Sequence, residues 1–410
     1  MVSVCLYFQV HQPYRLKRYS VFDIGNNHDY FDVVKNRDTL KKVAEKCYLP
    51  ANKAMLELIR KTDGKFRIAY SMTGVVLDQF EEYYPEVLDS FKELVNTGAV
   101  ELLGETYFHS LSYLYSKSEF IDQVRMHEKK LKKLFNYKPT VFRNTELIFK
   151  NELAYDLENM GYKAVLAEGA DHILGWRSPN FIYTPKTCKN IKLLLKNYRL
   201  SDDVAFRFSE KSWGEWPLTA PKFAGWVSSV NGNGNTVNLF MDYETFGEHQ
   251  WADTGIFEFL KSMPHEILRH PHNNFKTPSE VVESYNTMGE LDIHFPVSWA
   301  DIERDLSAWL GNTMQRSAAY ELYRMEGAVR ASGDASLMND WRKLQTSDHF
   351  YYMCTKWFND GDVHKYFNPY STPYDAFISF MNVLNDMRLR LNKKEDNNAK
   401  REMLHECARS

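Results

Sequence analysis

The 410-residue chain has few of the features that mark several common protein classes. Its five cysteines are scattered and odd in number, and none are spaced as a zinc-binding pair, so we expect buried free thiols rather than a disulfide framework. No apolar run approaches the roughly 18 residues that a transmembrane helix requires, and no basic flank precedes the apolar segment at the start. These absences predict a soluble, cytoplasmic protein with no membrane contact.

The chain also has no large excess of charge of either sign. The 51 Lys and Arg residues nearly balance the 54 Asp and Glu residues, which gives a formal net charge of -3. The sequence therefore has no overall basic field to hold nucleic acid. It has neither a glycine-rich phosphate loop nor a Gly-x-Ser-x-Gly elbow, so nucleotide chemistry and acyl transfer through such an elbow are disfavoured.

The composition that is present is typical of a globular protein, with 44% hydrophobic and 26% charged residues. Short β-type runs recur through the first 300 residues, with amphipathic helical patterns between several of them. Strands alternating with helices predict an α/β fold, and seven or eight such units predict a TIM-like β/α barrel, distorted or incomplete, over residues 1–300. The expected strands are Ser3–Val10, Phe66–Met72, Val100–Leu103, Thr140–Phe142, Ala164–Ala167, Ile191–Leu195, Val237–Met241 and an eighth candidate, Ile293–Val297.

Two local patterns refine this expectation. Ser118 is a candidate N-cap for the helix that carries Phe120 and Val124 on its apolar face. The run Asn231-Gly-Asn-Gly-Asn235 predicts a β-hairpin that leads into the strand at Val237, because tight hairpins need residues that adopt positive φ angles.

The pattern changes to helical after about residue 300. Thr372-Pro-Tyr-Asp375 is typical of a capped helix start, with proline at the first helical position. Phe377, Phe380, Met381, Leu384 and Met387 then form one apolar stripe. We expect residues 301–410 to form a helical domain that packs on the barrel and completes the active site.

Acids and imidazoles follow several of the expected strands directly. In a β/α barrel the residues at the carboxyl ends of the strands carry the chemistry. The candidates at these positions are His11 after the first strand, Glu105 and His109 after the third, Arg143 and Glu146 after the fourth, and Asp242 and Glu244 after the strand at Val237.

Two kinds of chemistry fit these residues. A pair of carboxylates could cleave or transfer a glycosidic bond. Alternatively, His11, His109 and Asp242 could bind a divalent metal that activates water, although no His-x-His or His-Glu-x-x-His spacing supports this. Taken singly, each residue also has a structural interpretation, such as an acid at a helix N-terminus for Glu146.

Taken together, five segments resemble glycoside hydrolase family 57, the family of α-amylases and 4-α-glucanotransferases. They occur in the family's order from the N-terminus to about residue 390. The segments are Val10-His-Gln-Pro13, Gly98-Ala-Val-Glu-Leu-Leu-Gly104, Phe142-Arg-Asn-Thr-Glu-Leu147, Met241-Asp-Tyr-Glu-Thr-Phe-Gly247 and Ser347-Asp-His-Phe-Tyr-Tyr-Met353.

The resemblance implies a seven-stranded incomplete barrel followed by a helical domain, and a retaining mechanism. By position, Glu146 is the implied nucleophile and Asp242 the implied general acid/base, with Arg143 or His11 helping to keep Glu146 ionised. Other motif positions are implied to shape the sugar subsites, and Trp299 and Trp309 to stack on acceptor-side glucose units. The predicted substrate-binding residues are His11, Glu101, Glu244 and Asp348 at motif positions, Glu105, His109 and His349, which are adjacent to motif positions and chemically suitable, and Arg143, Trp299 and Trp309.

We therefore expect an intracellular α-amylase-like glycosidase that acts on α-1,4-glucans or maltooligosaccharides and requires no cofactor or metal. A 4-α-glucanotransferase would use the same residues, and a metal-dependent hydrolase or deacetylase on a related barrel is the alternative of another class. A glucan-binding protein without catalysis is a further alternative. The sequence leaves the oligomeric state open.

Overall fold

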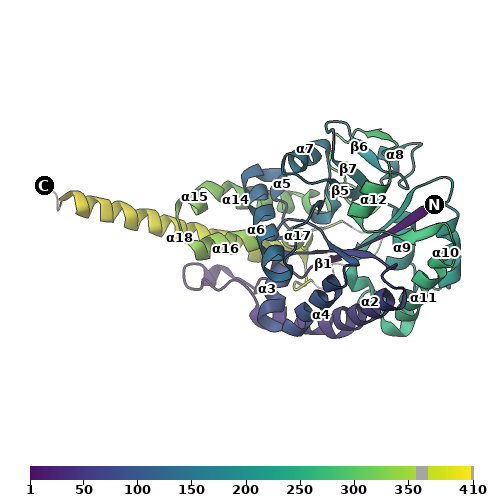
Figure 1. Ribbon diagram of the computed structural model, residues 1–410. Helices are drawn as coiled ribbons and strands as arrows, with labels where there is room; N and C mark the ends of the chain where they lie inside the picture. Colours follow the sequence, from purple (N-terminus) through teal and green to yellow (C-terminus); the bar gives the residue numbers. More distant parts are fainter. Residues whose placement is uncertain (357–367, 408–410) are drawn as a thin grey trace.

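The computed structural model describes residues 1–356 and 368–407, and the side chains of the last helix as far as Lys393. Strands lie at the centre of an α/β fold, and helices surround them and extend to one side (Figure 1). The strands are β1 (Val2–Val10), β2 (Ile68–Met72), β3 (Val100–Leu102), β4 (Val141–Arg143), β5 (Ala164–Glu168), β6 (Tyr183–Pro185), β7 (Lys192–Lys196), β8 (Thr236–Asp242), β9 (Asn273–Phe275) and β10 (Gly289–Leu291).

The helices are distributed along the whole described chain. They are α1 (Val33–Val43), α2 (Leu49–Lys61), α3 (Gly74–Tyr83), α4 (Pro85–Asn96), α5 (Ser112–Tyr115), α6 (Lys117–Phe135), α7 (Asn151–Asn159), α8 (Asp171–Leu174), α9 (Tyr198–Ala205), α10 (Ala220–Ser228), α11 (Ile256–Leu268), α12 (Pro278–Ser284), α13 (Ser307–Leu310), α14 (Thr313–Arg324), α15 (Glu326–Ala331), α16 (Ala335–Lys343), α17 (Ser347–Tyr351) and α18 (Pro373–Cys407).

The first sheet is built around β1. Its order is β3-β2-β1-β8, β9 also pairs with β1, and all of these pairings are parallel. Leu6 of β1 lies opposite Ile68 of β2 and Leu239 of β8. Every residue of β1 is buried, as expected for a strand covered on both faces, and this explains its nearly continuous apolar sequence.

The second sheet has the order β10-β6-β7-β5-β4, with β6 antiparallel to β7. Backbone hydrogen bonds connect the two sheets in two places, between β3 and β4 and between β7 and β8. Gly104, just after β3, donates to the carbonyl of Val141 at 2.9 Å and accepts from the amide of Arg143 at 2.8 Å. On the other side, the Asn197 amide donates to the Asn238 carbonyl at 2.9 Å. The carboxyl ends of β3 and β4 therefore lie side by side.

Two of the local predictions are wrong. Ile293–Val297 is not a strand; only Val297 forms a bridge, to Phe149, and Pro296 has no amide hydrogen to extend the ladder. The expected hairpin does not form either, because helix α10 precedes β8, which pairs with β1 in parallel. Gly232 does adopt a positive φ of 89°, but it serves a helix-to-strand turn.

Helix boundaries agree more closely with the sequence. Ser116, not Ser118, is the N-cap of α6, where its side chain accepts from the Glu119 amide. The predicted helix start at Pro373 is confirmed, and the Thr372 hydroxyl accepts from the Asp375 amide. A cap is defined by one hydrogen bond, and the apolar pattern of a helix does not distinguish which of two serines two residues apart forms it.

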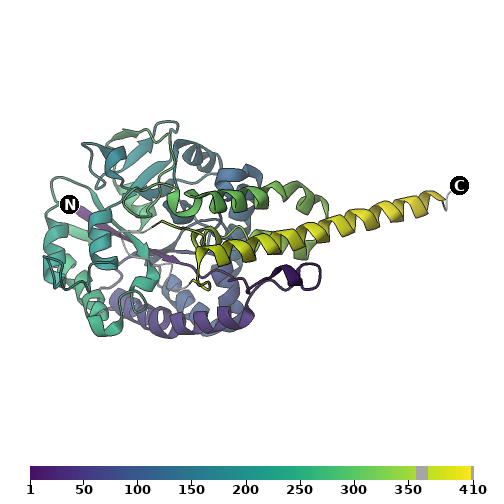
Figure 2. The same ribbon diagram turned by 180° about the vertical axis from the view of Figure 1, so that it is seen from behind.

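The described chain after residue 306 is helical, and its core includes residues from the first part of the chain. Phe380, Leu384 and Met387 of α18 are buried in one cluster with Tyr30 and Phe108. Figures 1 and 2 both show α14, α16 and α18 gathered at one end, with α18 projecting beyond the rest.

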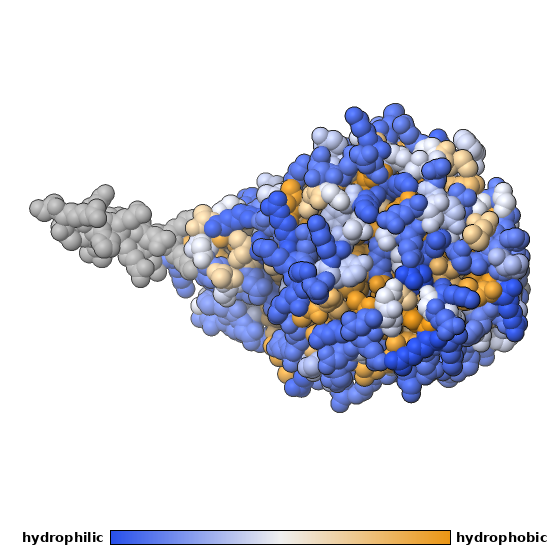
Figure 3. Space-filling view, viewed as in Figure 1, coloured by the Kyte–Doolittle hydropathy of each residue, from blue (hydrophilic) through white to orange (hydrophobic). Residues whose placement is uncertain are grey.

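The face seen in Figure 3 is largely hydrophilic, with apolar residues gathered in a few areas. Within residues 1–356 and 368–407, no helix is both long and apolar enough to span a bilayer.

Candidate active site

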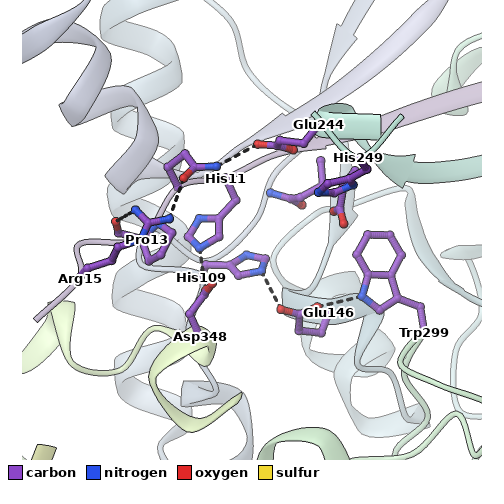
Figure 4. Close-up of a pocket in the computed structure, with 12 residues that line it drawn as sticks. His11, Pro13, Arg15, His109, Glu146, Glu244, His249, Trp299 and Asp348 are labelled. Atoms are coloured by element: carbon purple, nitrogen blue, oxygen red, sulfur yellow. Dashed lines mark hydrogen bonds and ion pairs between the residues drawn. The ribbon is translucent and has the colours of Figure 1, made fainter. Parts of the chain in front are cut away.

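Polar side chains from distant parts of the chain meet in one pocket (Figure 4). Most of them come from the ends of β1 and β8, from the segments that follow β3 and β4, and from α17. The lining residues are Gln9, His11, Gln12, Pro13, Arg15, His109, Glu146, Asp242, Glu244, His249, Trp299 and Asp348. As expected from the sequence, residues at and just after the ends of strands form most of this site.

Glu146 accepts hydrogen bonds on both carboxyl oxygens. The Trp299 indole nitrogen donates to Oε2 at 2.8 Å, and the Ser347 hydroxyl donates to Oε1 at 3.0 Å. His109 Nε2 lies 3.2 Å from Oε1. Glu146 has a left-handed φ of 57° in a short turn after β4, a conformation that non-glycine residues seldom adopt. The carboxylate is thus held in one orientation by partners that outweigh the local strain.

His109 lies between two buried carboxylates. Its Nδ1 is 3.3 Å from Glu105 Oε2, and its Nε2 contacts Glu146 on the other side. Burial lowers the pKa of His109, but the hydrogen bonds to Glu105 and Glu146 outweigh this and raise the pKa to about 9. His109 is therefore a cation at neutral pH, and it places positive charge against Glu146.

His11 stacks on His109, with ring centroids 4.2 Å apart. Its Nε2 lies 2.9 Å from Asp348 Oδ2, and its Nδ1 lies 3.0 Å from the Thr73 hydroxyl. Burial and the neighbouring His109 charge both lower the pKa of His11. The two stacked imidazoles thus differ in charge state, and Asp348 brings α17 of the helical region into the site.

Asp242 is the last residue of β8, and Glu244 lies two residues further on, in the short turn Tyr243–Thr245. Asp242 is partly exposed in the pocket, whereas Glu244 is buried and accepts from the side-chain Nε2 of Gln12 at 3.3 Å. Burial, and next the charge of Asp242, raise the pKa of Glu244 to about 8. The pocket therefore holds an acid with a raised pKa beside Asp242 and a hydrogen-bonded carboxylate at Glu146.

Trp299 is fixed by three cations and by Glu146 itself. The Arg143 guanidinium carbon lies 4.7 Å from the ring centroid, and the Lys196 ammonium lies 5.4 Å from it. Arg304 donates to the Trp299 carbonyl at 2.6 Å, and the Trp299 amide donates to the Glu146 carbonyl at 3.2 Å. Arg143 is fully buried and supports the site from behind the indole ring rather than from the pocket wall.

Several predicted site residues do not line this pocket. Glu105 is linked to it through His109, but Glu101 accepts from the Ser279 amide at the start of α12. Trp309 is 1% exposed in the core of the helical region. His349 is buried beside Phe380, and burial lowers its pKa to about 4.

Four polar pocket residues, Gln9, Gln12, Arg15 and His249, and the hydrogen-bonding residue Ser347 were not singled out from the sequence. Gln12 lies in the first matched segment and His249 two residues after the fourth, so treating every polar residue in and next to those segments as a candidate would have found them. Ser347 precedes Asp348 in the last matched segment. No local signal marks Gln9, which lies inside an apolar strand.

In the part of the chain that the structure describes, no group of three or more His, Cys, Asp and Glu side chains is arranged to hold a metal ion. Both ring nitrogens of His11 and of His109 already have partners within 3.3 Å.

A pair of carboxylates in one pocket is the arrangement that most glycosidases use to cleave a glycosidic bond. The model of glycosyl hydrolase family 57 matches residues 5–294, and this chain belongs to that family. The "Putative alpha-amylase" of Methanocaldococcus jannaschii is 45% identical over 392 residues, which cover 92% of this chain and 82% of that protein. The resemblance inferred from the five segments is therefore confirmed, and the chain is a family 57 enzyme.

Two solved structures share the fold. The 4-alpha-glucanotransferase of Thermococcus litoralis superposes with a TM-score of 0.67 at 16% identity, over 95% of this chain and 60% of that one. The GH57-type branching enzyme of Pyrococcus horikoshii has a TM-score of 0.64 at 16% identity, over 86% of this chain and 85% of that one. This chain thus spans about three fifths of the transferase.

Proposed function

We propose that this protein is a retaining glycosidase that cleaves α-1,4-glucosidic bonds in starch- or glycogen-type glucans or in maltooligosaccharides. The observation that carries the proposal is the pairing of Glu146 and Asp242 in one pocket, with Glu146 hydrogen-bonded on both oxygens. The α-amylase name of the 45% identical relative supports the same substrate class.

In this proposal Glu146 attacks the anomeric carbon while Asp242 gives its proton to the leaving glycosidic oxygen. Water then enters, Asp242 accepts its proton, and the glycosyl–enzyme bond breaks. A retaining pair requires the two carboxyl groups about 5–5.5 Å apart. The His109 cation and the Trp299 and Ser347 donors keep Glu146 charged and aimed, and this is the state that a nucleophile needs.

A 4-α-glucanotransferase is the second candidate. It uses the same two carboxylates, and a sugar hydroxyl rather than water resolves the intermediate. The fold shared with the Thermococcus litoralis 4-alpha-glucanotransferase is compatible with it. The choice depends on whether an acceptor sugar or water reaches the intermediate first.

A metal-dependent hydrolase is less compatible with the site. The proposed ligands His11 and His109 would each have to leave a carboxylate or hydroxyl partner to coordinate a cation. A divalent ion would also meet the positive charge of His109, which has a pKa of about 9.

We further propose that the seven strands β1, β2, β3, β4, β5, β7 and β8 form the incomplete barrel of the family, with residues 1–300 as the catalytic domain. The bonds at Gly104 and at Asn197 support this arrangement. Residues 301–410 would complete the site, since Asp348 and Ser347 come from them. A cytoplasmic location stays a prediction of the sequence.

The test is a product analysis with a defined maltooligosaccharide such as maltoheptaose, with Glu146→Gln and Asp242→Asn as matched variants. Shorter sugars alone, lost in both variants, support the hydrolase. Longer and shorter sugars together assign the transferase. Absence of any product with the wild-type protein would refute the α-1,4-glucan assignment.

A further inference from the structure

A second groove shares no lining residue with the catalytic pocket. It is lined by the π-helical turn η2 (Ala44–Tyr48), by α2 and α11, and by the loop that follows Asp242. Helices α2 and α11 lie next to each other in Figure 1. Its volume of about 700 Å³ is within the range of ligand-binding pockets. The lining residues are Glu45, Lys46, Pro50, Lys53, Ala54, Glu57, Gly247, Trp251, Ala252, Asp253, Phe257, Glu258 and Lys261.

The loop that carries this groove is firmly attached to the protein. Gly247 has a φ of 111°, and a Cβ atom there would lie 2.0 Å from the Lys46 carbonyl, so only glycine allows the loop to approach η2. The Gln250 side chain donates to the Ala205 carbonyl at 2.9 Å, and the Gly247 amide donates to the Gln250 carbonyl at 2.9 Å. The groove is therefore preformed in the absence of ligand.

Trp251 is the largest apolar side chain exposed in the groove, with 53% of its surface accessible. The Lys46 ammonium lies 5.2 Å from its ring centroid, which holds the indole in place. Pro50, Ala54 and Phe257 add apolar surface beside it. An exposed, fixed aromatic ring suits a flat ligand with an apolar face.

The charges in the groove are mixed and nearly balanced. Four carboxylates (Glu45, Glu57, Asp253 and Glu258) stand among three ammonium groups (Lys46, Lys53 and Lys261). Such a lining offers many hydrogen-bond donors and acceptors but little net field, so it does not select an anion or a cation. A neutral polyhydroxylated ligand fits this combination of an aromatic surface and polar groups of both signs.

One loop connects this groove to the catalytic pocket. His249 lines the pocket and its amide donates to the Glu244 carbonyl at 2.9 Å, while Trp251, two residues later, lies in the groove. We propose that the groove is a second α-glucan-binding site, separate from the catalytic pocket, that holds a polymeric substrate on the enzyme through Trp251. This inference rests on the proposed function and names where a long glucan is held.

The test compares Trp251→Ala with Trp176→Ala, a matched control that removes an 88% exposed tryptophan outside the groove. Both changes are made in the Glu146→Gln protein so that the polymer is not degraded, and migration is measured in native gels that contain glycogen or dextran. Trp251→Ala should raise the glycogen concentration for half-maximal retardation about fivefold to tenfold, the size of one aromatic contact. Trp176→Ala should change it by less than about twofold.

Trp251→Phe keeps an aromatic ring and should restore most of the retardation, while thermal unfolding midpoints check that each variant is folded. Equal retardation of Trp251→Ala and Trp176→Ala in glycogen would overturn the inference, and so would equal retardation of the parent in glycogen and dextran. If the wild-type enzyme cleaves maltoheptaose but either of these two equal retardations is observed, only the second site is refuted. If it neither cleaves maltoheptaose nor is retarded by glycogen, the proposed function fails as well.

Discussion

The His109 cation predicts a specific dependence of stability on pH. Its pKa rises from the ordinary value of 6.5 to about 9 in the folded protein, where it is 3% exposed between Glu105 and Glu146. A shift of this size corresponds to about 3 kcal/mol of folding free energy. Because the folded pKa is the higher one, this stabilisation is fully present below pH 6.5 and is lost as the pH rises through about 9.

The measurement is the free energy of unfolding in denaturant at several pH values from 6 to 10, for the wild-type protein and for His109→Gln. Other groups titrate over this range in both proteins, and their effects cancel in the difference between the two. That difference should shrink by about 3 kcal/mol across the range. The ratio kcat/KM should fall on the same basic limb, since loss of the proton removes the positive charge beside Glu146.

A difference that stays constant within about 0.5 kcal/mol would refute the reasoning, because it would mean that the pKa of His109 is the same in the folded and the unfolded protein. Glu105→Gln provides an independent check. It removes one of the two carboxylates that raise the pKa of His109, so the basic limb of activity should move to lower pH.

Three further predictions concern the surroundings of the site. Trp299→Phe removes the 2.8 Å hydrogen bond to Glu146 and should lower kcat/KM about tenfold or more, as loss of a bond to a charged group implies, while unchanged kinetics would contradict the role given to the indole nitrogen. Glu101→Gln should lower the free energy of unfolding by about 1 kcal/mol and leave kcat/KM within about twofold, because Glu101 holds the Ser279 amide at the start of α12, and a large loss of activity without loss of stability would return it to the substrate site. Activity should survive dialysis against a chelator, and a loss that added zinc restores would instead support the metal-dependent alternative.

The local sequence determined much of the framework. Apolar runs predicted seven of the strands in the two sheets, namely β1, β2, β3, β4, β5, β7 and β8. A strand that is buried on both faces needs an apolar run whatever its partner strands are. Proline and threonine marked the start of α18. Patterns that serve more than one structure failed, as at Asn231–Asn235, where the same positive-φ residues suit a hairpin or a turn from a helix to a strand.

The sequence likewise predicted some residues of the candidate site but not others. The sequence placed His11, Glu146 and Asp242 at strand ends, and parallel strands bring such ends to one edge. Only the tertiary structure decided that Trp299 and Ser347, 153 and 201 residues further on, donate to Glu146. These contacts depend on how separate elements pack.

Packing also separated residues that the sequence had grouped. Glu101 serves the start of α12, Trp309 fills the helical core, and His349 turns toward Phe380 while its neighbour Asp348 reaches His11. A sequence fixes the chemistry and the local geometry of each side chain. The direction in which a side chain points depends on the orientation of its whole element, and distant contacts across the core set that orientation.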